Sequence, residues 1–138
     1  MKYVFLLLGI LFFSLLGHNT VADTTIRINE FFIEPTPQQV EIINTGTQSA
    51  DISGWYIDDN GGSTYYTIPQ SSILYPNACL VFAGDFNLNK SSPDTIRLFN
   101  TIAPPTSTNA NLIDSFSYKL SSGSGISYLR LPDGTDNW

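Results

Sequence analysis

The mature chain has no histidine, because the only one in the sequence, His18, lies in a leader that we expect to be removed. Without an imidazole, the chain cannot build a Ser-His-Asp or Cys-His nucleophile or a histidine-based zinc site. Cysteine is almost absent as well: Cys79 stands alone, so no disulfide can form within the chain. Cys79 lies in the apolar stretch ACLVF with no cation beside it, which predicts a buried, unreactive thiol. These absences favour a protein that is not an enzyme.

The start of the chain has the features of a secretory signal. Lys2 precedes an apolar run over residues 4–16, and the small residues Thr20-Val21-Ala22 form a cleavage site. We therefore expect residues 1–22 to be a signal peptide, followed by a secreted or cell-surface domain. The apolar run is short for a membrane span, so we expect no span in the mature chain. An uncleaved N-terminal anchor is the alternative.

Positive charge is scarce: 6 Lys and Arg stand against 12 Asp and Glu, for a formal net charge of −6. Removal of the leader takes away Lys2 and brings the charge of the mature chain near −7. A chain this acidic gains nothing from counterion release at a phosphate backbone, so we expect no nucleic-acid partner. The length of the mature chain suits one domain with its own core.

No part of the mature chain has a helical period, whereas short β-branched and aromatic runs alternate with Gly, Pro, Asn and Ser clusters. Polar residues alternate with Val40 and Ile42 in one run, and Ile113 and Phe116 stand beside polar neighbours in another. Such half-buried strands are typical of an antiparallel β-sandwich or barrel. The segment 101–110 is too rich in proline and polar residues for a strand and reads as a surface loop. We expect eight strands, over residues 26–33, 39–44, 54–58, 64–68, 78–83, 94–99, 112–118 and 126–131.

Five segments, in this order, resemble the motifs of the lamin-tail domain family. They are INE at residues 28–30, VEIIN at 40–44, DISGW at 51–55, DTIRL at 94–98, and RLPDG at 130–134 followed by Trp138. The residues that carry the resemblance as a structural signature are Asn29, Glu30, Gly54, Trp55, Arg130, Pro132, Asp133 and Gly134.

This resemblance, to the exported prokaryotic type of the family, implies an all-β, immunoglobulin-like antiparallel β-sandwich over residues 23–138. It also implies a binding or adhesion module without catalytic activity, attached to a protein, a cell surface or a matrix component through loops or an exposed sheet edge. Two alternatives stay open. The chain is a fragment or accessory targeting domain of a larger exported enzyme, since such modules often accompany the family, or it is a carbohydrate-binding module.

Carboxylates are the only acid–base groups left for chemistry. Asp58 and Asp59 are adjacent, and neighbouring strand residues point to opposite faces, so the two carboxylates do not converge. We expect both to be solvated residues that flank a hairpin turn, in which Asn60-Gly61 supplies the positive φ angles. Glu30 and Glu41 share a wet face, and an arginine such as Arg27 or Arg130 is their expected partner.

Calcium is the only cofactor that the sequence offers, because exported acidic domains meet it and supply oxygen ligands. Asp85, Asn87 and Asn89 match the first half of an EF-hand loop, although Lys90 replaces the required glycine and Ile96 the bidentate glutamate. The pair Asp58 and Asp59 is a second candidate. We expect no cofactor otherwise.

Tyrosine is abundant, with 7 in the sequence. Strips of aromatic side chains on a sheet bind sugars or proteins, but tyrosine is also a common strand residue at half-buried positions. Because adjacent strand residues alternate, at least one of Tyr65 and Tyr66 lies on the wet face, and these two are the candidate binding residues. Trp55, by contrast, is expected to pack in the core.

Overall fold

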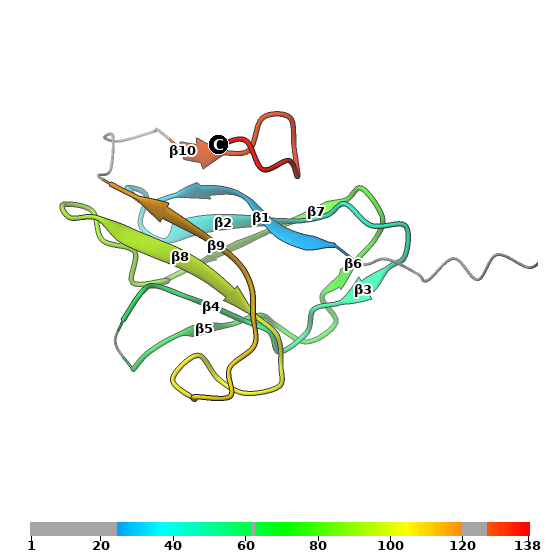
Figure 1. The fold of residues 1–138 in the computed structure, drawn as a ribbon, viewed down its shortest axis with the longest axis horizontal. Helices are drawn as coiled ribbons and strands as arrows, with labels where there is room; N and C mark the ends of the chain where they lie inside the picture. The colour runs from blue at the N-terminus through cyan, green and yellow to red at the C-terminus, as the bar shows by residue number, and fades with distance from the viewer. Residues whose placement is uncertain (1–24, 62, 120–126) are drawn as a thin grey trace, which may run out of the picture.

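The computed structural model describes residues 25–61, 63–119 and 127–138, and these parts contain strands and turns but no helix. In the described residues there is accordingly no helix long and apolar enough to cross a membrane. The expected signal peptide, residues 1–22, lies outside them. The all-β prediction is confirmed, and the strands form two antiparallel sheets packed face to face (Figure 1).

The first sheet has the strand order β10-β1-β2-β7, with all three pairings antiparallel. Its strands are β10 (Ser127–Leu129), β1 (Ile26–Phe32), β2 (Gln38–Asn44) and β7 (Cys79–Gly84).

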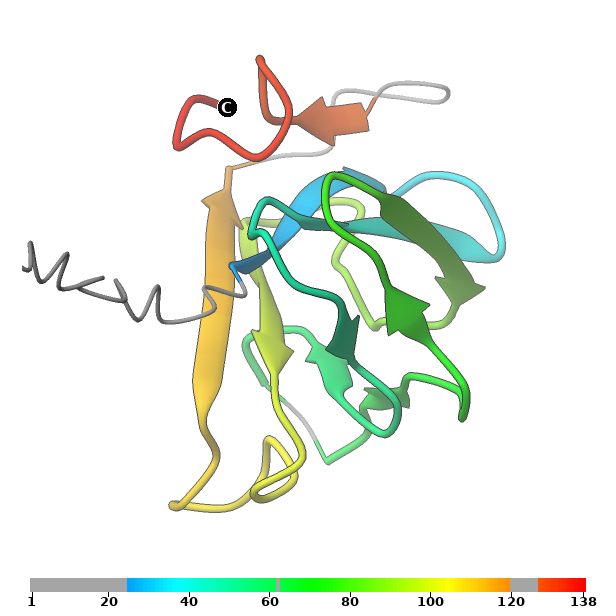
Figure 2. The same ribbon diagram turned by 90° about the vertical axis from the view of Figure 1, so that its right-hand side faces the viewer.

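The second sheet has the order β5-β4-β8-β9, and again every pair is antiparallel. It consists of β5 (Tyr66–Thr67), β4 (Tyr56–Asp58), β8 (Asp94–Phe99) and β9 (Leu112–Tyr118). A separate two-stranded ribbon joins β3 (Ala50–Asp51) to β6 (Ile73–Leu74). Figure 2 shows this ribbon beside the two main layers.

The core lies between the inner faces of the two sheets and follows from the alternation along each strand. Val40 and Ile42 of β2 are fully buried, as are Ile96 and Leu98 of β8. Phe31 is the centre of an aromatic cluster that closes one end of the core. The centroid of its ring lies 5.1 Å from the ring centroid of Tyr128, 5.7 Å from those of Tyr118 and Trp138, and 6.1 Å from that of Phe116.

The predicted strands are confirmed with small differences at their ends, and the segment 101–110 is a loop as expected. The ribbon of β3 and β6 was not predicted, because two-residue strands carry no alternation to detect. A hairpin connects β4 to β5 as expected, but the expectation of positive φ angles at Asn60-Gly61 is wrong. Ile57 pairs with Tyr66, so the connection is a longer loop, and Gly61 does not adopt the left-handed φ that a two-residue turn needs.

Strand β9 turns a charged residue toward the interior. Asp114, Phe116 and Tyr118 point inward, whereas Ile113 lies on the outer face with 36% exposure. An inward aspartate breaks the apolar pattern because Asp114 pairs with an arginine of the C-terminal segment. A sequence pattern of apolar residues cannot reveal such a partner.

Candidate binding surface

The outer face of the first sheet combines carboxylates with exposed apolar side chains. Because Val40 and Ile42 point into the core, Gln39 and Glu41 point outward from β2. The register of β1 against β2 shifts between Ile28 and Glu30, and this irregularity lets both Ile28 and Phe31 point inward. Glu30 and Phe32 consequently lie on the outer face.

A shallow hollow of about 150 Å³ lies on this face. It spans the three strands β1, β2 and β7. Its lining residues are Glu30, Phe32, Gln39, Glu41 and Val81. Val81 is 60% exposed, and Leu129 of β10, which is opposite Glu30 in the register, is 41% exposed. The face therefore offers apolar contact area next to two carboxylates.

Glu30 and Glu41 stand directly opposite each other on neighbouring strands. Asn29 Nδ2 donates to Glu41 Oε1 at 2.7 Å, and the Ser127 hydroxyl donates to Glu30 Oε1. Like charges directly opposite on a sheet cost stability. Neutral donors hold these two carboxylates in place, and among the described residues no cation pairs with them.

The expectation that Arg27 or Arg130 pairs with these glutamates is wrong. Arg27 pairs with Asp136, and Arg130 pairs with Asp114. Both arginines bind carboxylates outside the hollow, so the hollow keeps its negative charge.

The hollow borders β7, the last strand of the sheet. Asn44 N donates to Ala78 O at 3.1 Å, so these two residues form a hydrogen-bonded pair. In an antiparallel ladder every second pair is hydrogen-bonded, and this fixes which β7 residues bond to β2. Leu80 and Phe82 then direct their backbone groups to β2, whereas Cys79, Val81 and Ala83 direct theirs away from the sheet. No strand of the described chain pairs with that side of β7.

Edge strands of natural sheets are usually protected by a charge, a proline or a bulge. The β7 sequence CLVFAG has neither a charged residue nor a proline, and its pairing with β2 is regular over six residue pairs. The sequence interpretation missed this site, although the uncharged run was visible in it. Only the strand order shows that this run lies at an edge.

Cys79 lies on this edge and is half-buried rather than fully buried as expected. Burial raises the pKa of its thiol to about 11, and the nearby Glu41 carboxylate acts in the same direction. The prediction of an unreactive thiol agrees with this shift, because at neutral pH almost no thiolate forms.

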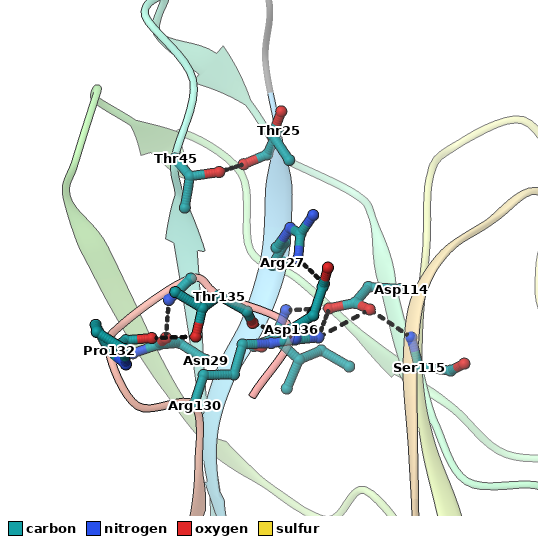
Figure 3. Close-up of polar contacts among 12 residues, drawn as sticks. Thr25, Arg27, Asn29, Thr45, Asp114, Ser115, Arg130, Pro132, Thr135 and Asp136 are labelled. Carbon is teal, nitrogen blue, oxygen red and sulfur yellow. Dashed lines mark hydrogen bonds and ion pairs between the residues drawn. The ribbon is translucent and has the colours of Figure 1, made fainter. Parts of the chain in front are cut away.

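At the opposite edge of the sheet, the short strand β10 leads into a corner built around Arg130 (Figure 3). Arg130 is 3% exposed, and its Nε donates to Ile28 O at 2.7 Å. Its Nη2 reaches both carboxylate oxygens of Asp114, at 3.1 and 2.9 Å. The guanidinium also lies 4.4 Å from the ring of Trp138, which stacks on Phe116 at 4.1 Å.

Other signature residues hold the same corner together. Gly134 has φ +69° and donates its N–H to Asn29 Oδ1 at 2.8 Å. A Cβ at Gly134 would lie 2.1 Å from the Thr45 methyl group, so any side chain there would clash. Asn29 Nδ2 also reaches Asp133 at 3.2 Å, while Pro132 O accepts from Thr135. These contacts connect the C-terminal segment to β1 and β2.

The Gly54-Trp55 signature is structural too. Gly54 adopts φ +73° and donates its N–H to Ile68 O at 2.9 Å, and Ile68 N donates in return to Trp55 O at 2.8 Å. The Trp55 ring packs against the core. The motif thus forms the turn that leads into β4.

Asp58 is not solvated, contrary to expectation, but 2% exposed. It lies opposite Arg97 in the register, and Arg97 Nη2 donates to its Oδ2 at 3.0 Å. Its Oδ1 has no hydrogen-bond partner within the described residues. Burial raises the pKa of Asp58 to about 6, and the attraction of Arg97 opposes this only in part. Asp59 is half-exposed, and its Oδ1 accepts from Gly61 N.

The calcium candidates do not form a cluster. Asp85 Oδ1 accepts from Asn87 N at 3.1 Å, and the Asn87 amide donates to Thr64 Oγ1 at 2.8 Å. Asn89 N donates to Asp94. No group of three or more acidic, cysteine or histidine side chains within the described ranges could hold a metal ion. Calcium binding stays a prediction, which a calorimetric titration would test.

The two candidate tyrosines point to different sides. Tyr66 packs against the core, with its ring 4.9 Å from Phe86 and 6.3 Å from Phe82. Tyr65 meets Tyr56 edge to face at 5.1 Å. Tyr65 and Tyr66 do not form one stacking platform, so a sugar site would have to use Tyr65 with Tyr56.

An immunoglobulin-like β-sandwich with an open sheet edge is the architecture of a binding-type domain. The family model named Lamin Tail Domain matches residues 19–120, and the chain belongs to this family. The matched range ends before β10, although β10 pairs with β1. No curated protein matches the chain.

Proposed function

We propose that this protein is an exported attachment module that binds another protein through the first sheet. The observation that carries the proposal is the unprotected β7 edge, which lies next to the exposed Val81 and the Glu30–Glu41 hollow. A long apolar edge invites pairing with another chain and is costly to leave open. A binding role accounts for this edge, whereas a purely structural role does not.

Export is the second part of the proposal. It is supported by the leader-like residues 1–22 and by an acidic composition with one cysteine, which suits a soluble secreted domain. The module would hold its partner at a cell surface or in a matrix. An accessory role within a larger exported enzyme uses the same surface and the same chemistry.

The experiment has two readouts. Mass spectrometry of the protein recovered outside the cells should give a chain that begins at Asp23. The labelled protein should bind surface preparations of the source organism saturably, and this binding should be lost in Val81→Lys, because lysine protects an edge strand. The control is Ile102→Gln, a change at an exposed loop residue outside the first sheet. Retention of the protein inside the cell, or binding that never saturates, would contradict the proposal.

A further inference from the structure

We propose that the β7 edge and the neighbouring hollow bind an extended, lysine- or arginine-bearing segment of a partner protein as a fifth strand of the first sheet. This inference rests on the proposed attachment function and names the chemistry of the partner. It follows from three features: the backbone groups of β7, the spacing to Glu41, and the distribution of charge.

The backbone of β7 supplies the unpaired hydrogen-bonding groups to which a partner strand can bind. Cys79, Val81 and Ala83 each present an N–H and a C=O on the open side of the strand, by the alternation that Asn44 and Ala78 set. A partner segment of about five residues would match this length at roughly 3.3 Å per residue. The main-chain hydrogen bonds of an added strand provide affinity without regard to side chains.

The side chains next to the β7 edge determine which partner sequence is preferred. Every second side chain of an added strand would lie on the outer face, beside Val81 and the hollow. The added backbone would stand about 10 Å from β2, two strand spacings away. A lysine or arginine side chain spans most of this distance, its apolar stem crossing Val81 and its charged end reaching Glu41. A short or acidic side chain could not make this contact.

Charge selects a basic partner over a second copy of this chain. The three arginines of the described part are all engaged in ion pairs outside the hollow, with Asp136, Asp58 and Asp114. Pairing of β7 with β7 of a second copy would bring two Glu41 carboxylates to one interface, and no arginine of the described part is free to pair with them. Each copy also carries a formal net charge of −6. A basic segment meets the carboxylates instead of repelling them.

The test is a titration of the ¹⁵N-labelled protein with two acetylated heptapeptides, one alternating valine with lysine and the other valine with glutamate. We expect the lysine peptide to shift the amide signals of Cys79, Val81 and Ala83 and the glutamate peptide to leave them in place. Glu41→Gln should weaken the lysine peptide roughly three- to fivefold, the range of an exposed ion pair. The matched control Asp51→Asn removes a carboxylate on β3 and should leave binding unchanged.

Two variants of β7 test whether the peptide binds to the backbone of this strand. Val81→Pro removes an outward N–H and should abolish the shifts, while Val81→Lys, which keeps the backbone intact, should weaken the lysine peptide at least tenfold. Equal binding of both peptides, shifts confined to another surface, or β7 shifts that follow protein concentration and dimer formation would overturn the inference. Saturable binding to surface preparations together with unshifted β7 amides would reject this inference and leave the attachment function standing.

Discussion

The two edge strands of the first sheet, β10 and β7, have different surroundings. At the β10 edge, the C-terminal segment folds back so that Arg130, Asp114 and Trp138 fill the end of the sandwich. The β7 strand has no charged residue or proline, and no strand of the described part of the chain covers its outer edge. Arg27 and Arg130 pair with carboxylates at the β10 corner, whereas Glu30 and Glu41 next to the β7 edge have no cation partner in the described part.

The Arg130 corner is where a single substitution should cost most. Arg130→Met removes the guanidinium and leaves the partly buried Asp114 carboxylate without a cation, with only the Ile28 and Ser115 N–H groups as donors. Breaking a buried ion pair in this way costs about 3 to 5 kcal/mol of the free energy of unfolding. Arg130→Lys should rescue little, because an ammonium cannot serve Ile28 O and both Asp114 oxygens together. Urea denaturation measures both, and a loss below 1 kcal/mol in Arg130→Met would contradict the assigned role.

The buried pair of the second sheet should make stability depend on pH. Burial raises the pKa of Asp58 from its ordinary value of 3.8 to about 6 in the folded protein, so the folded state retains the proton between these values. Stability from this group is therefore full below pH 3.8 and is lost as the pH rises to 6. The loss is at most about 3 kcal/mol. Asp58→Asn should remove it, so the difference between the two proteins should grow from pH 4 to pH 6; a constant difference would refute the account.

Trp138 should contribute less than Arg130 because it is only partly buried. Trp138→Ala removes the stacking on Phe116 and the contact with the Arg130 guanidinium. We expect a loss of about 2 kcal/mol, below the range for a fully buried tryptophan. Thermal or urea unfolding measures it. Trp138→Phe keeps a ring over Phe116 and should therefore lose only about half as much free energy of unfolding. Equal losses in the Ala and Phe variants would argue against ring stacking.

The open edge should tolerate change. Val81→Pro removes an N–H that points away from β2, so the ladder keeps its hydrogen bonds and the free energy of unfolding should fall by less than about 1 kcal/mol. Leu80→Pro is the matched comparison, since the Leu80 N–H points to β2, and it should cost about 3 kcal/mol or more. Similar losses in both variants would mean that the alternation along β7 is other than described.

The sequence predicted the sandwich well because alternation and turn residues are local signals. VEIIN of β2 and DTIRL of β8 show their buried faces directly, and Gly54 and Gly134 mark turns that require a positive φ. The family resemblance added the order of these pieces, and the family match agrees with it over residues 19–120.

The site was less accessible from the sequence, because it depends on strands that are far apart in the chain. Whether Asp58 is solvated depends on Arg97, and whether Asp114 faces inward depends on Arg130. The edge position of β7 follows from the strand order alone, so the apolar run around Val81 read as core sequence. Charge partners and sheet edges are tertiary properties and leave no period in the sequence.

Hydrogen exchange along β7 tests the central claim most directly. In the free protein, the account predicts slow exchange at Leu80 and Phe82 and fast exchange at Val81 and Ala83, because only the first two donate to β2. Addition of the lysine-bearing heptapeptide should slow Val81 and Ala83 at least tenfold and leave Leu80 and Phe82 unchanged. Slow exchange at Val81 in the free protein, or fast exchange that the peptide does not alter, would contradict the claim that β7 is an open edge for a basic strand.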